Sequence, residues 1–200
     1  MEFREFPKIA RLFRPCIITE KIDGTNASVA IVDPRVDALP LGADDTAVAK
    51  RVEADTVLYM FAGSRTRWVT PNDDNYGWAS WVKQHADELW QLGLGVHYGE
   101  WWGQKIQRNY GLKEKRFSLF NVSRWADDRV RPACCGVVPI LYTGTFSTEA
   151  VNMQIEFLRA NGSVAAPGWT KPEGVVVFHV ASNHLYKITC EKDADPKGRA

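Results

Sequence analysis

The chain has 200 residues with a formal net charge of +1, and 45% of its residues are hydrophobic. This length fits one large domain or two small ones, and the apolar content is sufficient for a buried core. A net charge so close to zero excludes a strong overall field that would attract nucleic acid, so any such interaction must depend on local patches.

The four cysteines are Cys16, Cys134, Cys135 and Cys190. No pair has C-x-x-C spacing, and the adjacent Cys134 and Cys135 are not typical of a disulfide framework. We expect reduced thiols, as in a cytosolic protein. The N-terminal residues lack the apolar core of a secretory signal, and no segment is long and apolar enough to span a bilayer. The sequence therefore indicates a soluble intracellular protein, and we expect a cytoplasmic location.

Strands predominate among the elements that the sequence predicts. Apolar or alternating runs bounded by turn residues are typical of strands. They occur at Cys16–Thr19, Ala27–Val32, Val57–Ala62, Leu94–Glu100, Phe117–Val122, Val137–Tyr142, Gly174–Val180 and His184–Thr189. Asp23-Gly24 lies between the first two runs and predicts a tight turn. The polar stretch Asp33–Asp55 predicts a loop between strands.

Two helices are predicted from apolar residues at helical spacing. The first has Trp78, Trp81, Val82, His85, Leu89 and Trp90 on one face and ends before Gly93. The second has Val151, Ile155 and Leu158 on one face, between Ser147 and Asn161-Gly162. We find no internal repeat and no linker, and the polar C-terminal residues are expected to fray. The pattern predicts a strand-rich α+β fold in a single domain.

Lys21 is the first candidate for chemistry, because it follows an apolar strand and precedes the Asp23-Gly24 turn. A lysine nucleophile must be a neutral amine near neutral pH, which requires desolvation or neighbouring positive charge. The apolar end of the strand supplies desolvation, and Gly24 allows main chain to approach a ligand closely. The alternative is an ordinary hairpin with an exposed lysine, and this short motif alone does not exclude it.

The stretch KIDGTN, residues 21–26, resembles motif I of the covalent nucleotidyltransferases, which include ATP-dependent RNA and DNA ligases and mRNA capping enzymes. Later stretches resemble the family's further motifs in the same order. Gly63-Ser64-Arg65 resembles the second element, Tyr98–Trp101 motif III, Phe117–Val122 motif IIIa, Glu173–Val176 motif IV and Leu185–Ile188 motif V. Each stretch alone is a weak signal. Their occurrence in the family's order, each at the edge of a predicted strand, is specific for this family. The ending Thr25-Asn26 is most similar to the nick-sealing phage RNA ligases, whereas capping enzymes tend to carry Arg in place of Asn26.

The resemblance implies a nucleotidyltransferase (ligase adenylation domain) fold, with largely antiparallel sheets flanked by helices. It also implies that residues 1–200 form a single nucleotidyltransferase domain, without the C-terminal OB or helical domain that most relatives carry. The implied reaction has three steps. Lys21 attacks the α-phosphorus of ATP and forms lysyl-AMP, AMP moves to a 5′-phosphate end, and a 3′-hydroxyl then attacks that activated end.

The resemblance also assigns roles to residues. Nucleotidyl transfer mainly needs positioning and charge neutralisation, so Lys187 and Arg65 would join Lys21 as catalytic residues. Glu173 would hold a divalent cation, Mg²⁺ or Mn²⁺, because these ions prefer oxygen ligands. Glu100 would lie near the ribose, while Phe120 would stack on adenine with Val176 on its other face. The nucleotide-binding residues implied in this way are Glu20, Asp23, Gly24, Asn26, Glu100, Phe120 and Val176.

Two positions depart from the family's motifs. Motif V usually carries two lysines one residue apart, whereas this sequence has Lys187 and Thr189, with Lys192 three residues further on. Motif IIIa usually has Asp at the position of Asn121. Loss of a phosphate-binding cation would slow adenylation or shift its role to Lys192. Because side chains alternate along a strand, we expect Lys187 and Thr189 to share one face.

A basic stretch lies between the third motif and the Phe117 strand. Its cations are Lys105, Arg108, Lys113, Lys115 and Arg116, with Trp101, Trp102 and Tyr110 nearby. Basic side chains interleaved with aromatic ones suit a nucleic-acid surface. A solvated basic loop explains the same residues equally well.

The sequence predicts an ATP-dependent polynucleotide ligase that uses ATP and Mg²⁺ or Mn²⁺, with RNA as the preferred substrate. We expect a monomer that binds 5′-phosphate and 3′-hydroxyl ends in the cytoplasm, phage-encoded in a bacterial host. The alternatives are a minimal ATP-dependent DNA ligase and, ranked lower, a capping-type guanylyltransferase. A non-catalytic nucleic-acid-binding protein on a decayed ligase fold is a third alternative, suggested by Thr189.

Overall fold

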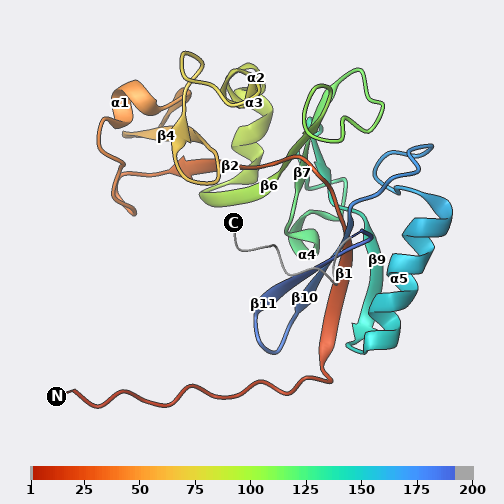
Figure 1. Ribbon diagram of the computed structural model, residues 1–200. Coiled ribbons are helices and arrows are strands. Elements are labelled where there is room, and N and C mark those ends of the chain that lie inside the picture. The colour runs from red at the N-terminus through yellow and green to blue at the C-terminus, as the bar shows by residue number, and fades with distance from the viewer. Residues whose placement is uncertain (1, 192–200) are drawn as a thin grey trace, which may run out of the picture. The chain divides into compact units, whose positions relative to one another are not determined.

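The computed structural model describes residues 2–191. The chain divides into two compact units (Figure 1). Unit 1 combines the residues up to Ile22 with those from Pro139 onward, and unit 2 is the continuous segment Asp23–Val138. Residues 2–14, which precede the first strand, form no helix or strand. Among residues 2–191, no helix has both the length and the apolar character needed to cross a membrane.

Unit 1 is built on a four-stranded antiparallel sheet in the order β11-β10-β1-β9. Its strands are β1 (Pro15–Lys21), β9 (Ile140–Thr145), β10 (Gly174–His179) and β11 (His184–Thr189). Helix α5 (Thr148–Asn161) packs on one face of this sheet (Figure 1). Ser147 caps α5, because its hydroxyl accepts a hydrogen bond from the Ala150 N–H at 3.0 Å.

The core of unit 1 lies between α5 and the sheet. Its buried residues are Cys16, Ile18, Val151, Ile155, Leu158, Val175 and Val177. The helix contributes positions four and three residues apart, and the strands contribute alternate positions, as the helical and strand periodicities require. One face of the sheet is therefore covered by α5, and the residues between these core positions point to the other face.

Unit 2 is built on a seven-stranded sheet in the order β3-β4-β2-β6-β7-β8, with β5 paired to β4. The strands are β2 (Thr25–Val32), β3 (Ala49–Glu53), β4 (Thr56–Gly63), β5 (Trp68–Val69), β6 (Gly95–Gly103), β7 (Lys115–Leu119) and β8 (Cys135–Val137). All its pairings are antiparallel except that of β7 with β8. The β2–β6 pairing brings the segment after Lys21 against the strand that carries Glu100.

The core of unit 2 is aromatic. Helices α2 (Trp78–Gln84) and α3 (Ala86–Leu89) and the 3₁₀ turn η1 (Trp90–Leu92) contribute Trp78, Val82, Leu89 and Leu92 to it. Trp78 packs 4.5 Å from Phe117 and 5.2 Å from Trp101 between ring centroids. Two short helices complete the unit, α1 (Ala43–Thr46) and α4 (Val122–Trp125).

The α+β fold class is confirmed, and several boundaries differ from the predicted ones. The run Val137–Tyr142 was expected to be one strand, but it contains the end of β8 and the start of β9, which belong to different sheets. Pro139 lies between them, and proline cannot donate a hydrogen bond to a strand ladder. The predicted helix that ends near Trp90 is broken at His85, and the predicted loop Asp33–Asp55 contains α1 and β3.

Candidate active site

Lys21 is the last residue of β1 and points away from α5. It pairs with Gly174 across the β1–β10 ladder, while the alternating residues Cys16 and Ile18 face the core. Its Nζ atom lies 2.6 Å from Oε2 of Glu173, and the two side chains are only 22% and 15% exposed. Among the described residues, that oxygen has no hydrogen-bond partner of good geometry, so this ion pair is its polar contact.

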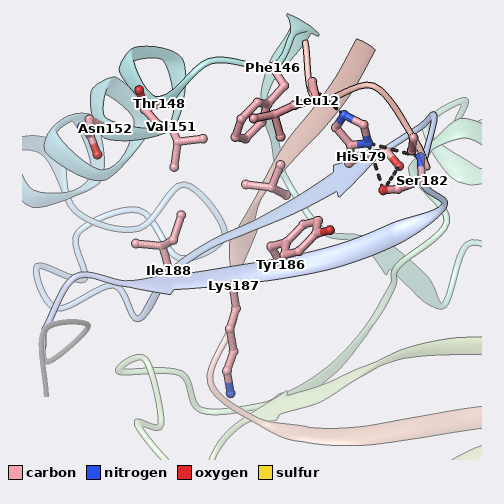
Figure 2. Close-up of a pocket in the computed structure, with 12 residues that line it drawn as sticks. Leu12, Phe146, Thr148, Val151, Asn152, His179, Ser182, Tyr186, Lys187 and Ile188 are labelled. Carbon is pink, nitrogen blue, oxygen red and sulfur yellow. Dashed lines mark hydrogen bonds between the residues drawn. The ribbon is translucent and has the colours of Figure 1, made fainter. Parts of the chain in front are cut away.

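Val176 and Lys187 lie on the same face of the unit 1 sheet as Lys21. Val176 pairs with Thr19 on β1 and with Lys187 on β11, and Gly174 pairs with both Lys21 and Thr189. Figure 2 shows Lys187 pointing away from Tyr186 and Ile188, which line a pocket of about 500 Å³ on the α5 side. The prediction that Lys187 and Thr189 share one face agrees with this register.

Lys187 and Thr189 differ in their surroundings. The Lys187 side chain is exposed and makes no ion pair with any of the described residues. The Thr189 hydroxyl donates a hydrogen bond to the main-chain oxygen of Glu191. Lys192, the other candidate cation for this motif, lies outside the described residues. Among the residues that the structure describes, Lys187 is thus the cation that β11 adds to the Lys21 face.

Glu20 points to the opposite face from Lys21. It is 1% exposed, and its carboxylate accepts hydrogen bonds from the Ser163 hydroxyl at 2.5 Å and from the Val164 and Ala165 N–H groups at 2.8 Å. Burial raises the pKa of the Glu20 carboxyl, while these hydrogen bonds act in the opposite direction. Its side chain is engaged by the Ser163–Ala165 segment, so contact with a nucleotide would have to come from its main chain.

In unit 2 the turn between β1 and β2 is held by three hydrogen bonds. The Asp23 N–H donates to the Tyr110 hydroxyl at 2.7 Å, and the Gly24 N–H donates to Oε1 of Glu100 at 3.0 Å. The Nε atom of Arg108 donates to Oδ2 of Asp23 at 2.9 Å. The sequence predicted a tight turn between two neighbouring strands, but β1 and β2 belong to different sheets and the chain makes only a bend at Gly24 between them. The sequence also gave no sign of the residues that hold this connection.

Two predicted nucleotide-binding residues meet on the face of the unit 2 sheet opposite the tryptophan core. Asn26 and Glu100 are direct cross-strand partners of β2 and β6. On the same strand as Glu100 and on the same face, Tyr98 is 56% exposed, and its main-chain oxygen accepts a hydrogen bond from the Phe120 N–H. Phe120 is 37% exposed, whereas the preceding Leu119 is in the core. Tyr98 belongs to one of the motif stretches, but the sequence assigned it no role, and its exposure on the face of Glu100 is a finding of the structure.

Asn121, which replaces the usual Asp, has a local role. Its side-chain oxygen accepts a hydrogen bond from the Arg124 N–H at 3.2 Å and caps helix α4. Both Asn and Asp serve well as helix N-caps, so the departure at residue 121 preserves this part of the fold.

Arg65 lies in the turn after β4, is exposed and makes no hydrogen bond with any residue in the described part of the chain.

The predicted basic surface is partly neutralised within the chain. Arg108 is paired with Asp23, Lys115 donates to the main-chain oxygen of Tyr76 at 2.6 Å, and Arg116 is paired with Glu114. Lys105 and Lys113 are exposed, and neither forms an ion pair within residues 2–191. These last two are the cations most available to a polyanion.

Residues 2–191 contain no group of three or more His, Cys, Asp or Glu side chains that could enclose a metal ion. Mg²⁺ is usually bound by one or two carboxylates together with substrate phosphates and water, so it needs no such enclosure. Glu173 fits this mode, because its Oε2 atom is buried and lacks a second partner. The donor set is therefore compatible with a metal ion that arrives with a phosphate ligand.

Comparison with protein families decides the classification. The family model described as RNA ligase matches residues 14–189. The chain belongs to the RNA ligase family. All the stretches that carry the resemblance, from Lys21 to Lys187, lie inside this match. No curated protein matches the sequence of this RNA ligase family member.

Solved structures of Naegleria gruberi RNA ligase variants share the fold. A variant with AMP and Mn is 18% identical with a TM-score of 0.55, and the match covers 89% of this chain and 50% of that one. An apo variant is 18% identical with a TM-score of 0.56, covering 92% and 53%. A variant with ATP and Mn is 18% identical with a TM-score of 0.51, covering 88% and 49%. The chain thus spans about half the length of these proteins, and the likeness concerns the fold.

Proposed function

We propose that this RNA ligase family member is an ATP-dependent RNA ligase that joins 5′-phosphate and 3′-hydroxyl ends through a lysyl-AMP on Lys21. The observation that carries the proposal is the environment of Lys21. Its side chain is only 22% exposed, its amine lies 2.6 Å from the Glu173 carboxylate, and it shares a sheet face with Lys187. An exposed hairpin lysine would show none of these features.

The first step follows from this arrangement. The Lys21 amine gives up a proton, for which the Glu173 carboxylate is the acceptor within reach, and then attacks the α-phosphorus of ATP. A P–N bond forms, the bond from the α-phosphorus to the bridging oxygen breaks, and pyrophosphate leaves. Lys187 stabilises the negative charge that develops during this transfer. AMP then passes to the RNA 5′-phosphate, and the 3′-hydroxyl displaces it.

The remaining roles are extensions of the family resemblance. Arg65, exposed and without an ion pair in the described part of the chain, would bind phosphate. Phe120 would stack on adenine, to which base–aromatic stacking contributes about 1–3 kcal/mol. Asn26 and Glu100, which are cross-strand partners, would bind the nucleoside, together with Asp23, Gly24 and Val176. Glu20 would contribute through its main chain alone.

A divalent metal ion, Mg²⁺ or Mn²⁺, is part of the proposal. The related Naegleria gruberi structures include complexes with ATP and Mn and with AMP and Mn. Such an ion neutralises phosphate charge and orients the triphosphate. Glu173 is the residue of this chain that would contact it, because its buried Oε2 atom has no polar contact besides Lys21 within the described residues. We propose further that the enzyme is a monomer, that it acts in the cytoplasm and that it is phage-encoded. Lys105 and Lys113 would lie nearest to the RNA backbone.

The decisive experiment is the intact mass of the purified protein after incubation with ATP, or with GTP, and Mg²⁺ or Mn²⁺. An increase by one AMP that is absent from Lys21→Ala and Lys21→Arg supports the proposal, since a guanidinium stays protonated and cannot attack. A GMP adduct would instead indicate a capping-type enzyme. A fully adenylated Lys21→Ala protein, or no adduct on the unmodified protein with either nucleotide, would refute the proposal.

The substrate is tested separately on nicked duplexes. The 2′-hydroxyl is the group by which a protein distinguishes RNA from DNA. We expect sealing to require ribonucleotides on the 3′-hydroxyl side of the junction. Equal rates on all-DNA and RNA-containing junctions would contradict this and favour a minimal DNA ligase.

A further inference from the structure

The loop between β6 and β7, residues 104–114, makes two contacts that the proposed function does not use. Both reach Asp23, two residues after Lys21 in the chain. The Tyr110 hydroxyl accepts a hydrogen bond from the Asp23 N–H at 2.7 Å, and Arg108 forms an ion pair with the Asp23 carboxylate at 2.9 Å. One contact holds the main chain of Asp23 and the other holds its side chain.

The shape of this loop is conformationally unfavourable. Lys105, Gln107, Asn109 and Tyr110 all have positive φ angles, of 60°, 42°, 61° and 52°. Residues other than glycine and asparagine rarely adopt positive φ angles, so these conformations persist only where the surrounding structure holds them. Buried anchors do so here: Ile106 is 0% exposed, and the Tyr110 ring packs edge-on against Trp102 at 5.1 Å. Clustered strain of this kind is typical of functional sites.

Gly24, the residue after Asp23, packs directly against strand β6. A side-chain carbon at Gly24 would lie 2.5 Å from the Trp101 main-chain oxygen and 2.7 Å from Cβ of Trp102. The main chain at Gly24 is therefore in direct contact with β6, and its N–H is bound by Glu100. The turn is thus fixed on both of its central residues by groups from β6 and from the loop that follows it.

We propose that Arg108 and Tyr110 are positioning residues for adenylation, which hold the main chain at Asp23 so that Lys21 keeps one reactive position. The inference rests on the proposed function. The Glu173 carboxylate holds the amine end of the Lys21 side chain at 2.6 Å. Because the four-carbon stem is flexible, a single reactive position also requires that the main chain at its other end is held. A misplacement of about 1 Å can reduce a reaction about 10²-fold. Arg108, considered above for a nucleic-acid surface, is assigned to this turn instead.

Tyr110→Phe tests the main-chain contact. It removes one oxygen and keeps the ring that packs on Trp102, so the fold should survive. Single-turnover formation of the AMP adduct is measured against ATP concentration. We expect the maximal rate to fall about 10- to 100-fold with half-saturation by ATP changed less than about twofold. Tyr59→Phe is the matched control, because its hydroxyl makes only an exposed hydrogen bond to Asp44 and should leave the rate unchanged.

Arg108 is tested by rescue. Arg108→Met should slow adenylation about 10-fold or more, and Arg108→Lys, which restores a cation and a donor, should recover most of the loss. If Arg108 had a merely structural role, Arg108→Met would lower the thermal stability of the protein, but its adenylation rate would not fall and Arg108→Lys would have nothing to recover. Arg131→Lys is the control for the loss of a partly buried arginine far from Asp23 in the sequence. Arg131 donates to the main-chain oxygens of Trp125 and Cys135, and its replacement should leave the adenylation rate unchanged.

Hydrogen exchange supplies a readout that does not depend on activity. The Asp23 amide should exchange faster in Tyr110→Phe than in the unmodified protein, because its acceptor is gone. An unmodified protein that forms no AMP adduct would refute the proposed function itself. An unmodified protein that is adenylated, with Tyr110→Phe and Arg108→Met reacting at the same maximal rate, would overturn the positioning role alone.

Discussion

At the scale of single residues, the ion pair between Lys21 and Glu173 dominates the candidate site. Both side chains are largely withdrawn from water, and their closest atoms are 2.6 Å apart. The pair holds the lysine side chain in one direction. In the proposed reaction the Glu173 carboxylate would accept the proton of this amine, and the same carboxylate is the candidate contact for a metal ion.

Glu173→Gln separates charge from shape. Glutamine keeps the size of the side chain but is neither a base nor a strong ligand for a hard cation. We expect adenylation to slow by about 10²–10⁴-fold, the usual contribution of a positioned acid or base. The rate of AMP adduct formation measures it, with Glu149→Gln on the exposed start of α5 as the control. Unchanged adenylation in Glu173→Gln would remove this residue from the mechanism.

Lys187 is the second residue whose change is informative. Lys187→Ala removes the cation that β11 adds to the Lys21 face, and one such donor contributes about 3–4 kcal/mol in comparable sites. Adenylation should therefore fall by about 10²–10³-fold, measured as the initial rate of adduct formation. Lys83→Ala, on α2, serves as the control. Lys192→Ala should be almost normal. If Lys192→Ala abolishes adenylation and Lys187→Ala does not, the assignment of Lys187 is wrong.

At the scale of elements, the register of the unit 1 sheet decides which side chains meet. Gly174 lies between Lys21 on β1 and Thr189 on β11. Its φ angle is +155°, and an added side-chain carbon would lie 2.1 Å from the Ile188 main-chain oxygen. No rotation of a neighbouring side chain could relieve such a contact, because the obstacle is main chain.

Gly174→Ala should accordingly push β11 away from β10. We expect a loss of stability of about 1–3 kcal/mol, as for other overpacked positions. Adenylation should fall as well, because Lys187 moves with its strand. Urea unfolding measures the first effect and adduct formation the second. Gly168→Ala is a useful comparison, since no atom would lie within 4 Å of the added carbon, although its positive φ adds some strain of its own. A Gly174→Ala protein as stable and as active as the original would contradict the register argument.

Strands with clear alternation and turn residues on both sides could be predicted from the sequence. His184–Thr189 was predicted with the bounds that β11 has, and the alternation that places Lys187 and Thr189 on one face agrees with its register. The strand predicted for Val137–Tyr142 failed, because an apolar run does not show that its halves belong to different sheets. The four-residue helix α4 was not predicted either, because so short an element has no periodic pattern and its main local signal is the cap residue Asn121.

The same limit applies to the site. The motif stretches could be predicted because each is a local pattern at a strand edge. The hydrogen bond from Asp23 to Tyr110 could not, because it joins residues 87 positions apart through a loop of positive φ angles. Nor could the burial of Glu20, whose three donors come from Ser163–Ala165. Contacts of this kind depend on tertiary structure and leave no periodic signal.

At the scale of the whole molecule, the two units contain buried titratable groups with opposite effects on stability. In unit 1, burial raises the pKa of Glu20, so this group favours folding at low pH and loses that contribution as pH rises through its folded pKa. In unit 2, burial lowers the pKa of His97, which accordingly favours folding above its ordinary pKa and loses that contribution as pH falls. The stability of each unit should therefore respond differently to pH.

Tryptophan fluorescence can follow unit 2, because every tryptophan except Trp169 belongs to it. Its urea midpoint should fall as pH decreases from about 7.5 to about 5.5, the range in which an unfolded histidine becomes protonated. His97→Gln, which can keep a donor toward the Gly93 oxygen, should flatten this dependence. His184→Gln, at an exposed position, is the control. An equally steep dependence in His97→Gln would show that another group is responsible.

The order in which the chain threads its two units has a consequence for biosynthesis. Strand β1 lies between β10 and β9 in its sheet, yet all of unit 2 is encoded between β1 and β9. At about 5–20 residues per second, the ribosome needs on the order of ten seconds or more to supply β10 after β1 has emerged. For most of that interval Cys16 and Ile18 lack helix α5, which covers them in the folded protein, whereas the whole of unit 2 has been synthesised by the time β10 appears. Lys21 is thus synthesised long before Glu173, and the ion pair between them can form only after the whole of unit 2 has been translated.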